Sequence, residues 1–307
     1  MLMFPGQGAQ KVGMCKAMRD CKKSREVFEK AEKYLGYNIL DICLGSEDIL
    51  KKKLSSTEFV QTALFVSCIA KIEDLQENDV TLQQVSCVAG LSVGEFAALV
   101  YSEVLSFNDA LKIVQYRGKC MDAELSKQST AMASILGPDT LQLQTFLNNA
   151  FPYVQISTFL ADKQHTVAGT VEDIEALINL LDSDTCTRDR LSVIDARRMR
   201  VAGAFHSSYM KTVAANVSQI INSCVFNKPS IPIVMNATGS VCDNPEQIKV
   251  LLSKQIEYAV MWKESMETAY AMGVRHFIEV APSRVLSTIV KTRIESCKGC
   301  KSELIVV

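Results

Sequence analysis

Residues 85–99 read Val-Ser-Cys-Val-Ala-Gly-Leu-Ser-Val-Gly-Glu-Phe-Ala-Ala-Leu, and this stretch decides the fold class. Its first five residues form an apolar run with the length and composition of a buried strand. Gly90 ends that run, and residues 93–101 read as a helix. The turn between them fits G-x-S-x-G, the pattern in which a serine sits on a sharp strand-to-helix turn. We therefore predict a nucleophile elbow with Ser92 at its tip.

The elbow has a physical rationale, but the pattern is short. A tight turn leaves no room for side chains at Gly90 and Gly94. Ser92 would lie at a helix N-terminus, where free backbone N–H groups favour developing negative charge. The motif alone leaves a second interpretation open, in which Ser92 only caps the helix between two packing glycines.

Outside the elbow, short apolar runs alternate with longer amphipathic ones, which is typical of α/β proteins. Ser106-Phe-Asn-Asp109 resembles a capping box with Asp in place of Glu, and it predicts the start of a helix that runs to about residue 125. We expect further helices at residues 22–35, 59–76, 207–223, 245–256, 261–272 and 283–295, and further strands at 2–4, 231–235 and 275–280.

A separate grouping lies in the middle of the chain. Residues 131–136 and 165–168 read as strands, 171–182 as a helix, and 191–194 as another strand. We expect this β-α-β grouping, about residues 126–201, to form a small inserted subdomain. Residues 1–125 and 202–307 would then form the core domain.

A nucleophilic serine needs a base, and the chain has three histidines: His165, His206 and His276. His276 lies within a predicted strand, where a structural role is more common, and His165 begins a strand in the insert. His206 lies at a junction between elements, where functional residues are frequent, so it is the leading candidate.

A second glycine loop, Phe4-Pro-Gly-Gln-Gly-Ala-Gln10, follows the first predicted strand. Loops after parallel strands gather at one edge of the sheet, so one of its amides could donate to an oxyanion beside the Val93 amide. The loop lacks the lysine and serine of a phosphate-binding P-loop, and a plain turn is the alternative.

Composition excludes several classes of protein. The 307 residues include 33 basic and 34 acidic side chains, so a bulk electrostatic hold on nucleic acid is not expected. The apolar runs are far shorter than the roughly 20 residues of a membrane helix. Eleven scattered cysteines indicate free thiols. Cys297-Lys-Gly-Cys300 has no second ligand pair, so we predict no metal site.

The chain resembles the malonyl-CoA:acyl carrier protein transacylases in segments that follow one another in family order along nearly its whole length. The similarity is closest to the mitochondrial enzymes of animals. The matching segments are residues 4–10, 61–64, 90–99, 116–121, 131–137, 203–206, 236–238, 255 and 279–282.

This resemblance implies a role for each matching polar residue. Ser92 would be the nucleophile and His206 its general base and acid, with Gln255 orienting His206 through a carbonyl. The amides of Gln7 and Val93 would form the oxyanion hole. Two residues would bind substrate: Arg117 would pair with the malonyl carboxylate, and Gln61 matches a pocket glutamine.

The resemblance also implies the fold and the partners. The fold would be an α/β-hydrolase-like core with a parallel sheet and an inserted ferredoxin-like subdomain. The reaction would move a malonyl group from malonyl-CoA to the phosphopantetheine thiol of acyl carrier protein, for fatty acid synthesis, with no cofactor. We expect a monomer in the mitochondrial matrix that contacts neither nucleic acid nor membrane. The chain begins almost at its first predicted strand, so we expect any transit peptide to be absent from it.

The chain departs from the family pattern at three places. Two other classes of function also remain as alternatives. Leu91 stands where bacterial members usually have histidine, Ala281-Pro-Ser283 replaces Gly-Pro-Gly, and residues 158–161 lack a common asparagine. A serine hydrolase would share the serine and the histidine but would need no carboxylate-binding arginine. A binding module that keeps the fold without catalysis is the other alternative.

Overall fold

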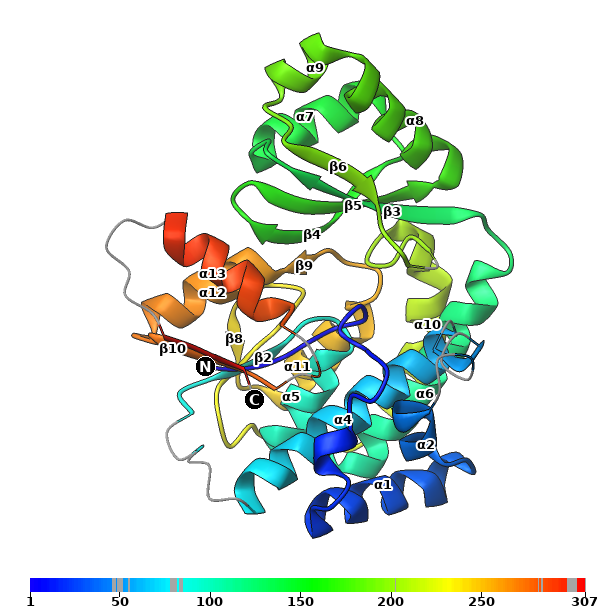
Figure 1. Ribbon diagram of the computed structural model, residues 1–307, viewed down its shortest axis with the longest axis vertical. Helices are drawn as coiled ribbons and strands as arrows, with labels where there is room; N and C mark the ends of the chain where they lie inside the picture. Colours follow the sequence, from blue (N-terminus) through cyan, green and yellow to red (C-terminus); the bar gives the residue numbers. More distant parts are fainter. Residues whose placement is uncertain are drawn as a thin grey trace.

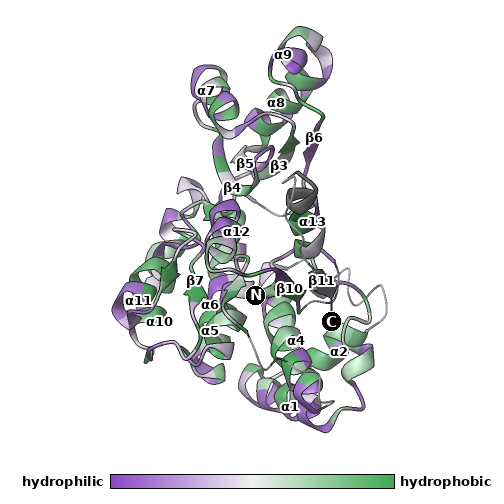
Figure 2. Ribbon diagram, turned by 90° about the vertical axis from the view of Figure 1, so that its left-hand side faces the viewer, coloured by the Kyte–Doolittle hydropathy of each residue, from purple (hydrophilic) through white to green (hydrophobic). Residues whose placement is uncertain are grey.

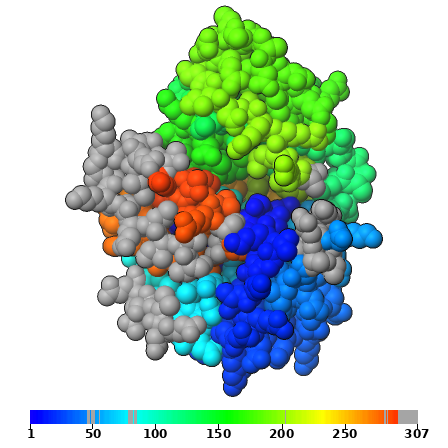
Figure 3. All heavy atoms as spheres, viewed as in Figure 1, coloured from blue at the N-terminus to red at the C-terminus, as the bar shows by residue number. Residues whose placement is uncertain are grey.

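Two β-sheets organise the chain in the computed structural model, one above the other in Figure 1. The structure describes residues 1–306 apart from 46, 47, 49–51, 55, 78–81, 83, 84, 202, 281, 283 and 297–302. Figure 3 shows the N-terminal segment, in blue, reaching up to the base of the portion that carries the second sheet, in green. Part of the N-terminal segment therefore lies next to the portion that carries the second sheet.

The first sheet is parallel except at one edge. Its strand order is β11 (Glu303–Val306), β10 (His276–Glu279), β1 (Leu2–Phe4), β2 (Val88–Gly90), β7 (Ile233–Val234) and β8 (Val241–Cys242), and only β7 with β8 is antiparallel. Phe4 of β1 is paired with Gly90 of β2. The loop that begins at Pro5 and the turn that begins at Leu91 therefore leave the sheet side by side.

Helices cover both faces of this sheet, as the alternation along its strands requires. Leu2 and Phe4 pack into a core with α4 (Thr57–Glu77), α5 (Gly94–Tyr101) and α6 (Phe107–Leu125). Met3 and Ala89 face the opposite core, with α12 (Trp262–Ala271) and α13 (Leu286–Ser296). The outer helices are α1 (Lys22–Leu35), α2 (Ile39–Leu44), α10 (Lys211–Asn222) and α11 (Pro245–Lys254), with short 3-10 turns at Lys16–Met18 and Ser208–Met210.

Helix α6 begins where its capping sequence predicts. The Ser106 hydroxyl accepts a hydrogen bond from the Asp109 N–H at 3.0 Å, which satisfies one of the unpaired amides of the first turn. Helix α6 packs along α4, whose residues are buried on nearly every side. Within the described residues, no helix is both long and apolar enough to cross a membrane.

The second sheet has the order β6 (Asp195–Arg198), β3 (Thr130–Leu136), β5 (Gln164–Thr170), β4 (Gln155–Ala161) and β9 (Val260–Met261). Its first four strands are antiparallel and join α7 (Thr140–Ala150), α8 (Val171–Ser183) and α9 (Thr185–Arg190) in the ferredoxin-like succession β-α-β-β-α-β. Helices α7 and α8 cover the face that points away from the first sheet (Figures 1 and 2). The opposite face of the second sheet therefore points towards the first sheet.

The predicted α/β class, with an α/β-hydrolase-like core and a ferredoxin-like addition, agrees with the observed topology. The predicted strand at residues 191–194 is wrong, because these residues form a turn and β6 begins at Asp195. Leu191 and Val193 are apolar because they are buried under the sheet while the chain turns at Ser192, whose φ is 56°. The second sheet also contains β9, which lies outside residues 126–201 and pairs with β4. The division of the chain into a core domain and an inserted subdomain stays a prediction.

Candidate active site

The turn after β2 has the geometry of a nucleophile elbow. Ser92 has a φ of 54°, in the left-handed region that non-glycine residues rarely adopt. A Cβ added at Gly90 would collide with the backbone of Gly94, and one at Gly94 would collide with the carbonyl oxygen of Phe4. The Leu91 N–H donates to that same Phe4 oxygen at 2.8 Å. Both glycines are therefore required by close backbone packing that aims the Ser92 side chain away from the sheet.

The His206 imidazole lies against this serine. Its Nε2 is 2.7 Å from Ser92 Oγ, and its Nδ1 is 2.9 Å from the Gln255 carbonyl oxygen and 3.3 Å from that of Tyr258. Carbonyl oxygens only accept hydrogen bonds, so this environment assigns the ring proton to Nδ1 and leaves Nε2 to accept from Ser92. Burial, and next the charge of Arg117, lower the pKa of His206 to about 4. The ring is therefore a neutral base at pH 7.

Arg117 is a buried cation at the same point. Its side chain projects from α6 and is 1% exposed. One guanidinium nitrogen donates to Gln61 Oε1 at 2.6 Å, and the other donates to Gln255 Oε1 at 2.9 Å and to Ser92 Oγ at 3.0 Å. Burial lowers the pKa of Arg117 to about 9 and the charge of Glu95 opposes this, so the group is charged at neutral pH.

The amides of Gln7 and Val93 have no backbone acceptor among the described residues. The Ser92 N–H, by contrast, donates to Asn236 Oδ1 at 2.7 Å. Gln7 follows β1 and Val93 follows Ser92, so the pairing of β1 with β2 brings both to one edge of the sheet.

A cavity of about 150 Å³ lies over Ser92, between the two sheets. Gln7, Ser92 and His206 line the cavity on the side of the first sheet. Most of the other lining residues are apolar. The other lining residues are Leu91, Met121, Met132, Thr158, Leu160, Thr166, Met199, Val201, Phe205, Val260, Val285 and Ile289. The cavity thus has a mostly apolar lining, with the serine hydroxyl and the imidazole at its polar end.

Two polar residues at the site were not singled out by the sequence analysis. Glu95 is 0% exposed; its Oε1 accepts from the Asn236 N–H at 2.6 Å and its Oε2 from Gln255 Nε2 at 2.8 Å. Asn236 also donates through its side chain to the Gly90 carbonyl oxygen. Burial raises the pKa of Glu95 to about 7, against the opposing effects of these hydrogen bonds and of Arg117. An acid in the first turn of an otherwise apolar helix was the signal that could have identified Glu95.

The remaining predicted residues lie elsewhere or outside the described ranges. His165 is buried in β5, with Nε2 2.9 Å from Thr140 Oγ1, and His276 is exposed at the start of β10. Ala281, Ser283 and the Cys297–Cys300 pair fall outside the described residues. In the part of the chain that the structure describes, no group of three or more acidic, histidine or cysteine side chains could hold a metal ion.

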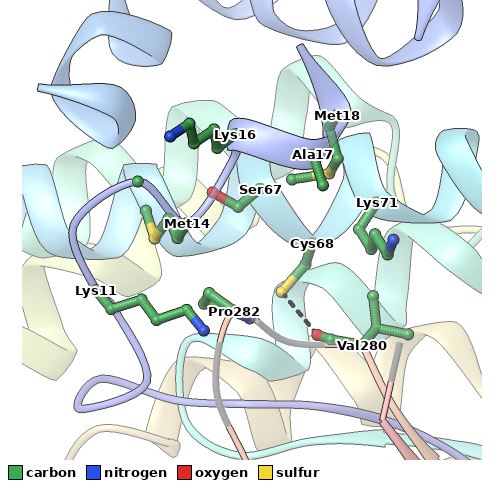
Figure 4. Close-up of a pocket in the computed structure, with 11 residues that line it drawn as sticks. Lys11, Met14, Lys16, Ala17, Met18, Ser67, Cys68, Lys71, Val280 and Pro282 are labelled. Atoms are coloured by element: carbon green, nitrogen blue, oxygen red, sulfur yellow. Dashed lines mark hydrogen bonds between the residues drawn. The ribbon is translucent and has the colours of Figure 1, made fainter. Parts of the chain in front are cut away.

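A larger cavity, of about 310 Å³, contains none of the predicted site residues. It lies between the segment that follows the first glycine loop, α4 and the residues after β10, with Lys11, Lys16 and Lys71 around it (Figure 4). The one thiol among its lining residues already has a partner, since Cys68 Sγ donates to the Val280 carbonyl oxygen at 3.4 Å. The smaller cavity is therefore the one that carries the convergent polar groups expected of an active site.

The comparisons with known proteins agree on one family. The acyl transferase domain model matches residues 1–307. A Drosophila melanogaster protein named probable malonyl-CoA-acyl carrier protein transacylase, mitochondrial, is 32% identical over 281 residues, which is 88% of this chain and 72% of its own. The malonyl CoA-acyl carrier protein transacylase of Bacillus subtilis is 30% identical over 293 residues, covering 94% of this chain and 88% of its own.

A solved structure of a malonyl-transacylase in complex with its type II PKS acyl-carrier protein is similar throughout. The TM-score is 0.88 at 26% sequence identity, and the match covers 100% of this chain and 94% of that chain. Since the family model spans every residue and the Drosophila relative is similar across most of the chain, this chain belongs to the acyl transferase domain family.

Proposed function

We propose that this acyltransferase moves a malonyl group from malonyl-CoA to the phosphopantetheine thiol of acyl carrier protein, by way of a malonyl ester on Ser92. The observation that carries the proposal is the convergence of two groups on one hydroxyl. His206 Nε2 lies 2.7 Å from Ser92 Oγ as a base, and the buried Arg117 cation donates to the same oxygen at 3.0 Å. A base activates the serine, and a cation beside it suits an acyl group that carries a carboxylate.

In the first half-reaction the Ser92 oxygen attacks the thioester carbonyl carbon while its proton passes to His206 Nε2. The carbonyl oxygen becomes an oxyanion and is stabilised by the amides of Gln7 and Val93. The carbon–sulfur bond then breaks, the carbonyl reforms, and CoA leaves with the proton from His206. The product is a malonyl-serine ester.

The second half-reaction is the reverse with a different thiol. The phosphopantetheine thiol gives its proton to His206 and its sulfur attacks the ester carbonyl. Ser92 leaves and recovers the proton, so neither half consumes a cofactor. The carbonyl oxygens of Gln255 and Tyr258 keep the Nδ1 proton in place and stabilise the imidazolium that forms in each half.

Arg117 gives the site its preference among acyl groups. A carboxylate that enters a mostly apolar cavity loses water and needs a matched donor pair, which a planar guanidinium offers. The Arg117 nitrogen that now donates to Ser92 Oγ is freed for that carboxylate when the oxygen becomes part of an ester. Phe205 is 5% exposed in the cavity wall beside His206, where it crowds a substituent on the α-carbon and so favours malonyl over methylmalonyl.

The names of the relatives support a partner and a compartment for this protein. The acyl carrier protein bound to the related transacylase supports such a carrier as the acceptor here. The Drosophila relative is named mitochondrial, so we propose the mitochondrial matrix for this protein as well. We propose that it acts as a monomer, without nucleic acid or membrane contacts.

The decisive experiment is intact-mass measurement after the protein is mixed with malonyl-CoA. Transfer predicts a malonyl adduct that persists on Ser92 and disappears when holo acyl carrier protein is added. Rapid release of free malonate without an acceptor would indicate a hydrolase. A folded protein that forms no adduct would indicate a binding module.

A further inference from the structure

Glu95 is a wholly buried carboxyl group that the proposed chemistry does not use. It lies in the first turn of α5, three residues after Ser92, and its N–H donates to the Ser92 carbonyl oxygen at 3.1 Å. Its two oxygens accept from the Asn236 backbone N–H and from Gln255 Nε2. A buried carboxyl group is costly unless its partners compensate for lost water, so its position beside the site calls for a function.

The Gln255 side chain can make its contacts in one orientation only. Its Nε2 donates to Glu95 Oε2 at 2.8 Å and to the Ser92 carbonyl oxygen at 2.7 Å, while its Oε1 accepts from Arg117 at 2.9 Å. An ionised carboxylate only accepts hydrogen bonds, so it requires the amide NH₂ to face it. The carbonyl end of the amide is thereby turned towards the Arg117 guanidinium.

The guanidinium is in turn held by two glutamine oxygens. Gln61 Oε1 accepts from one end of the Arg117 fork and Gln255 Oε1 from the other. The Nε2 atom of Gln61 lies 3.0 Å from Met121 Sδ, so this amide is oriented by a contact with an uncharged side chain. Of these two acceptors, Gln255 is the one whose orientation is set by an ionisable group.

We propose that Glu95 is a positioning residue: its carboxylate fixes the orientation of the Gln255 amide, and through it aims the Arg117 fork that recognises the acyl carboxylate. This inference rests on the proposed function, because it deepens the role given there to Arg117. Glu95 thus selects the acyl group without touching it.

The test is Glu95→Gln, which keeps size and shape, replaces one acceptor oxygen with an NH₂ group and removes the negative charge. The Asn236 N–H belongs to the backbone and cannot turn, so it keeps the one remaining oxygen. The new NH₂ group then faces the NH₂ group of Gln255, which cannot turn without losing its hydrogen bond to the Ser92 carbonyl oxygen. Whether the Gln255 amide turns or moves away, the oxygen that accepts from Arg117 leaves its place. We expect the ratio of malonyl to acetyl kcat/KM to fall at least about tenfold, because a misaligned fork loses bidentate recognition.

Simple charge effects predict the opposite result. Removing a negative charge beside Arg117 strengthens its field, which would raise malonyl transfer if orientation were unimportant. A ratio that stays the same or rises in Glu95→Gln would therefore overturn the proposal. Equal losses for both donors in a variant that is folded by circular dichroism would also contradict a role in selection.

Two further variants test whether the change in the malonyl-to-acetyl ratio is specific to Glu95. Glu124→Gln is the matched control, since Glu124 is another buried glutamate on the same helix as Arg117, and its carboxylate oxygens accept hydrogen bonds from Lys127 and Gln128. It should leave the ratio unchanged. Arg117→Ala separates the two hypotheses: if it lowers the ratio and Glu95→Gln does not, only the positioning role fails. If Arg117→Ala also leaves the ratio unchanged, carboxylate recognition fails and the positioning role fails with it.

The wild-type protein supplies a measurement that needs no variant, should Glu95→Gln not fold. The groups facing Glu95 are the Asn236 and Gln255 amides and the Arg117 guanidinium, and Arg117 stays charged below its pKa of about 9. Because the pKa of Glu95 is about 7, acidification protonates it and releases Gln255. The malonyl-to-acetyl ratio should fall as pH drops through 7. A ratio that is constant across that interval would overturn the proposal.

Discussion

The guanidinium of Arg117 donates a hydrogen bond of 3.0 Å to the hydroxyl oxygen of Ser92, although the two residues lie 25 positions apart, Ser92 in the turn before α5 and Arg117 on α6. The same oxygen is 2.7 Å from His206 Nε2. With a cation donating to it and a base accepting from it, the hydroxyl is already polarised before any substrate arrives. This arrangement leads to four predictions about the site.

Replacing Ser92 with alanine should abolish the acyl-enzyme and keep the fold. Loss of a nucleophile that acts together with its base lowers turnover on the order of 10⁴–10⁶-fold. Radioactive malonyl-CoA followed by gel analysis measures the adduct directly, and circular dichroism reports on the fold. Labelling of the alanine variant at the wild-type rate would assign the ester to another residue.

Replacing His206 with alanine should impair acylation to a similar extent, whereas His165→Ala and His276→Ala should not. His206 alone among the three lies against Ser92, while His165 is buried in β5 and His276 is exposed on β10. His165→Ala should lower the melting temperature, because it loses a hydrogen bond and leaves a cavity. Loss of acylation in folded His276→Ala, with normal acylation in His206→Ala, would show that the base is misassigned.

Replacing Arg117 with alanine should change the choice of acyl group. The malonyl carboxylate would lose its charged partner, at a cost of about 3–5 kcal/mol when the charge is fully buried. That energy corresponds to roughly 10²–10³-fold in malonyl transfer. Acetyl-CoA has no carboxylate and should lose little, so the malonyl-to-acetyl ratio of kcat/KM should fall at least about tenfold. Equal losses for both donors would indicate that Arg117 only supports the structure.

Acetyl transfer should continue at a lower pH than it would if the histidine base had its usual pKa. Burial and the nearby Arg117 lower the pKa of His206 to about 4, so the ring stays a free base well below its usual value of 6.5. We expect the rate of acetyl-enzyme formation to fall only as pH approaches 4, measured by rapid quench in buffers of constant ionic strength. A midpoint near 6.5 would contradict this.

The same pH profile offers an internal control. Arg117 acts on the His206 pKa in the lowering direction, so Arg117→Ala should move the acid limb of acetyl-enzyme formation to higher pH. An unchanged midpoint in that variant would mean that burial alone sets the pKa of the ring.

The elbow could be predicted from the sequence because it is local. The strand, the two glycines and the serine follow one another within a few residues, and the steric reason for Gly90 is the nearby backbone of Gly94. The steric reason for Gly94 is the Phe4 carbonyl oxygen on the neighbouring strand, but the G-x-S-x-G pattern already includes this glycine. Arg117 could not be predicted that way, since an arginine on a helix is usually solvated. Its acceptors are Gln61 and Gln255, which lie 56 and 138 residues away, so only the resemblance indicated its place.

The elements missed in the fold have identifiable causes. Strand β4 breaks the alternation of apolar and polar residues, because its pairing with β5 shifts register between Ile156 and Thr158 and again between Phe159 and Ala161. The run at Leu191–Ile194 is apolar without being a strand, since tertiary burial uses Leu191 and Val193 inside a turn. Periodicity detects neither case.

Strand β9 gives the second sheet a mechanical link to the catalytic base. It pairs with β4, and it begins two residues after Tyr258, whose carbonyl oxygen, like that of Gln255, faces His206 Nδ1. The seven residues 255–261 therefore hold two functions in one short segment: their first part orients the imidazole and their last part carries a strand of the upper sheet. The position of the upper sheet over the cavity and the orientation of the base are thus fixed by the same stretch of backbone.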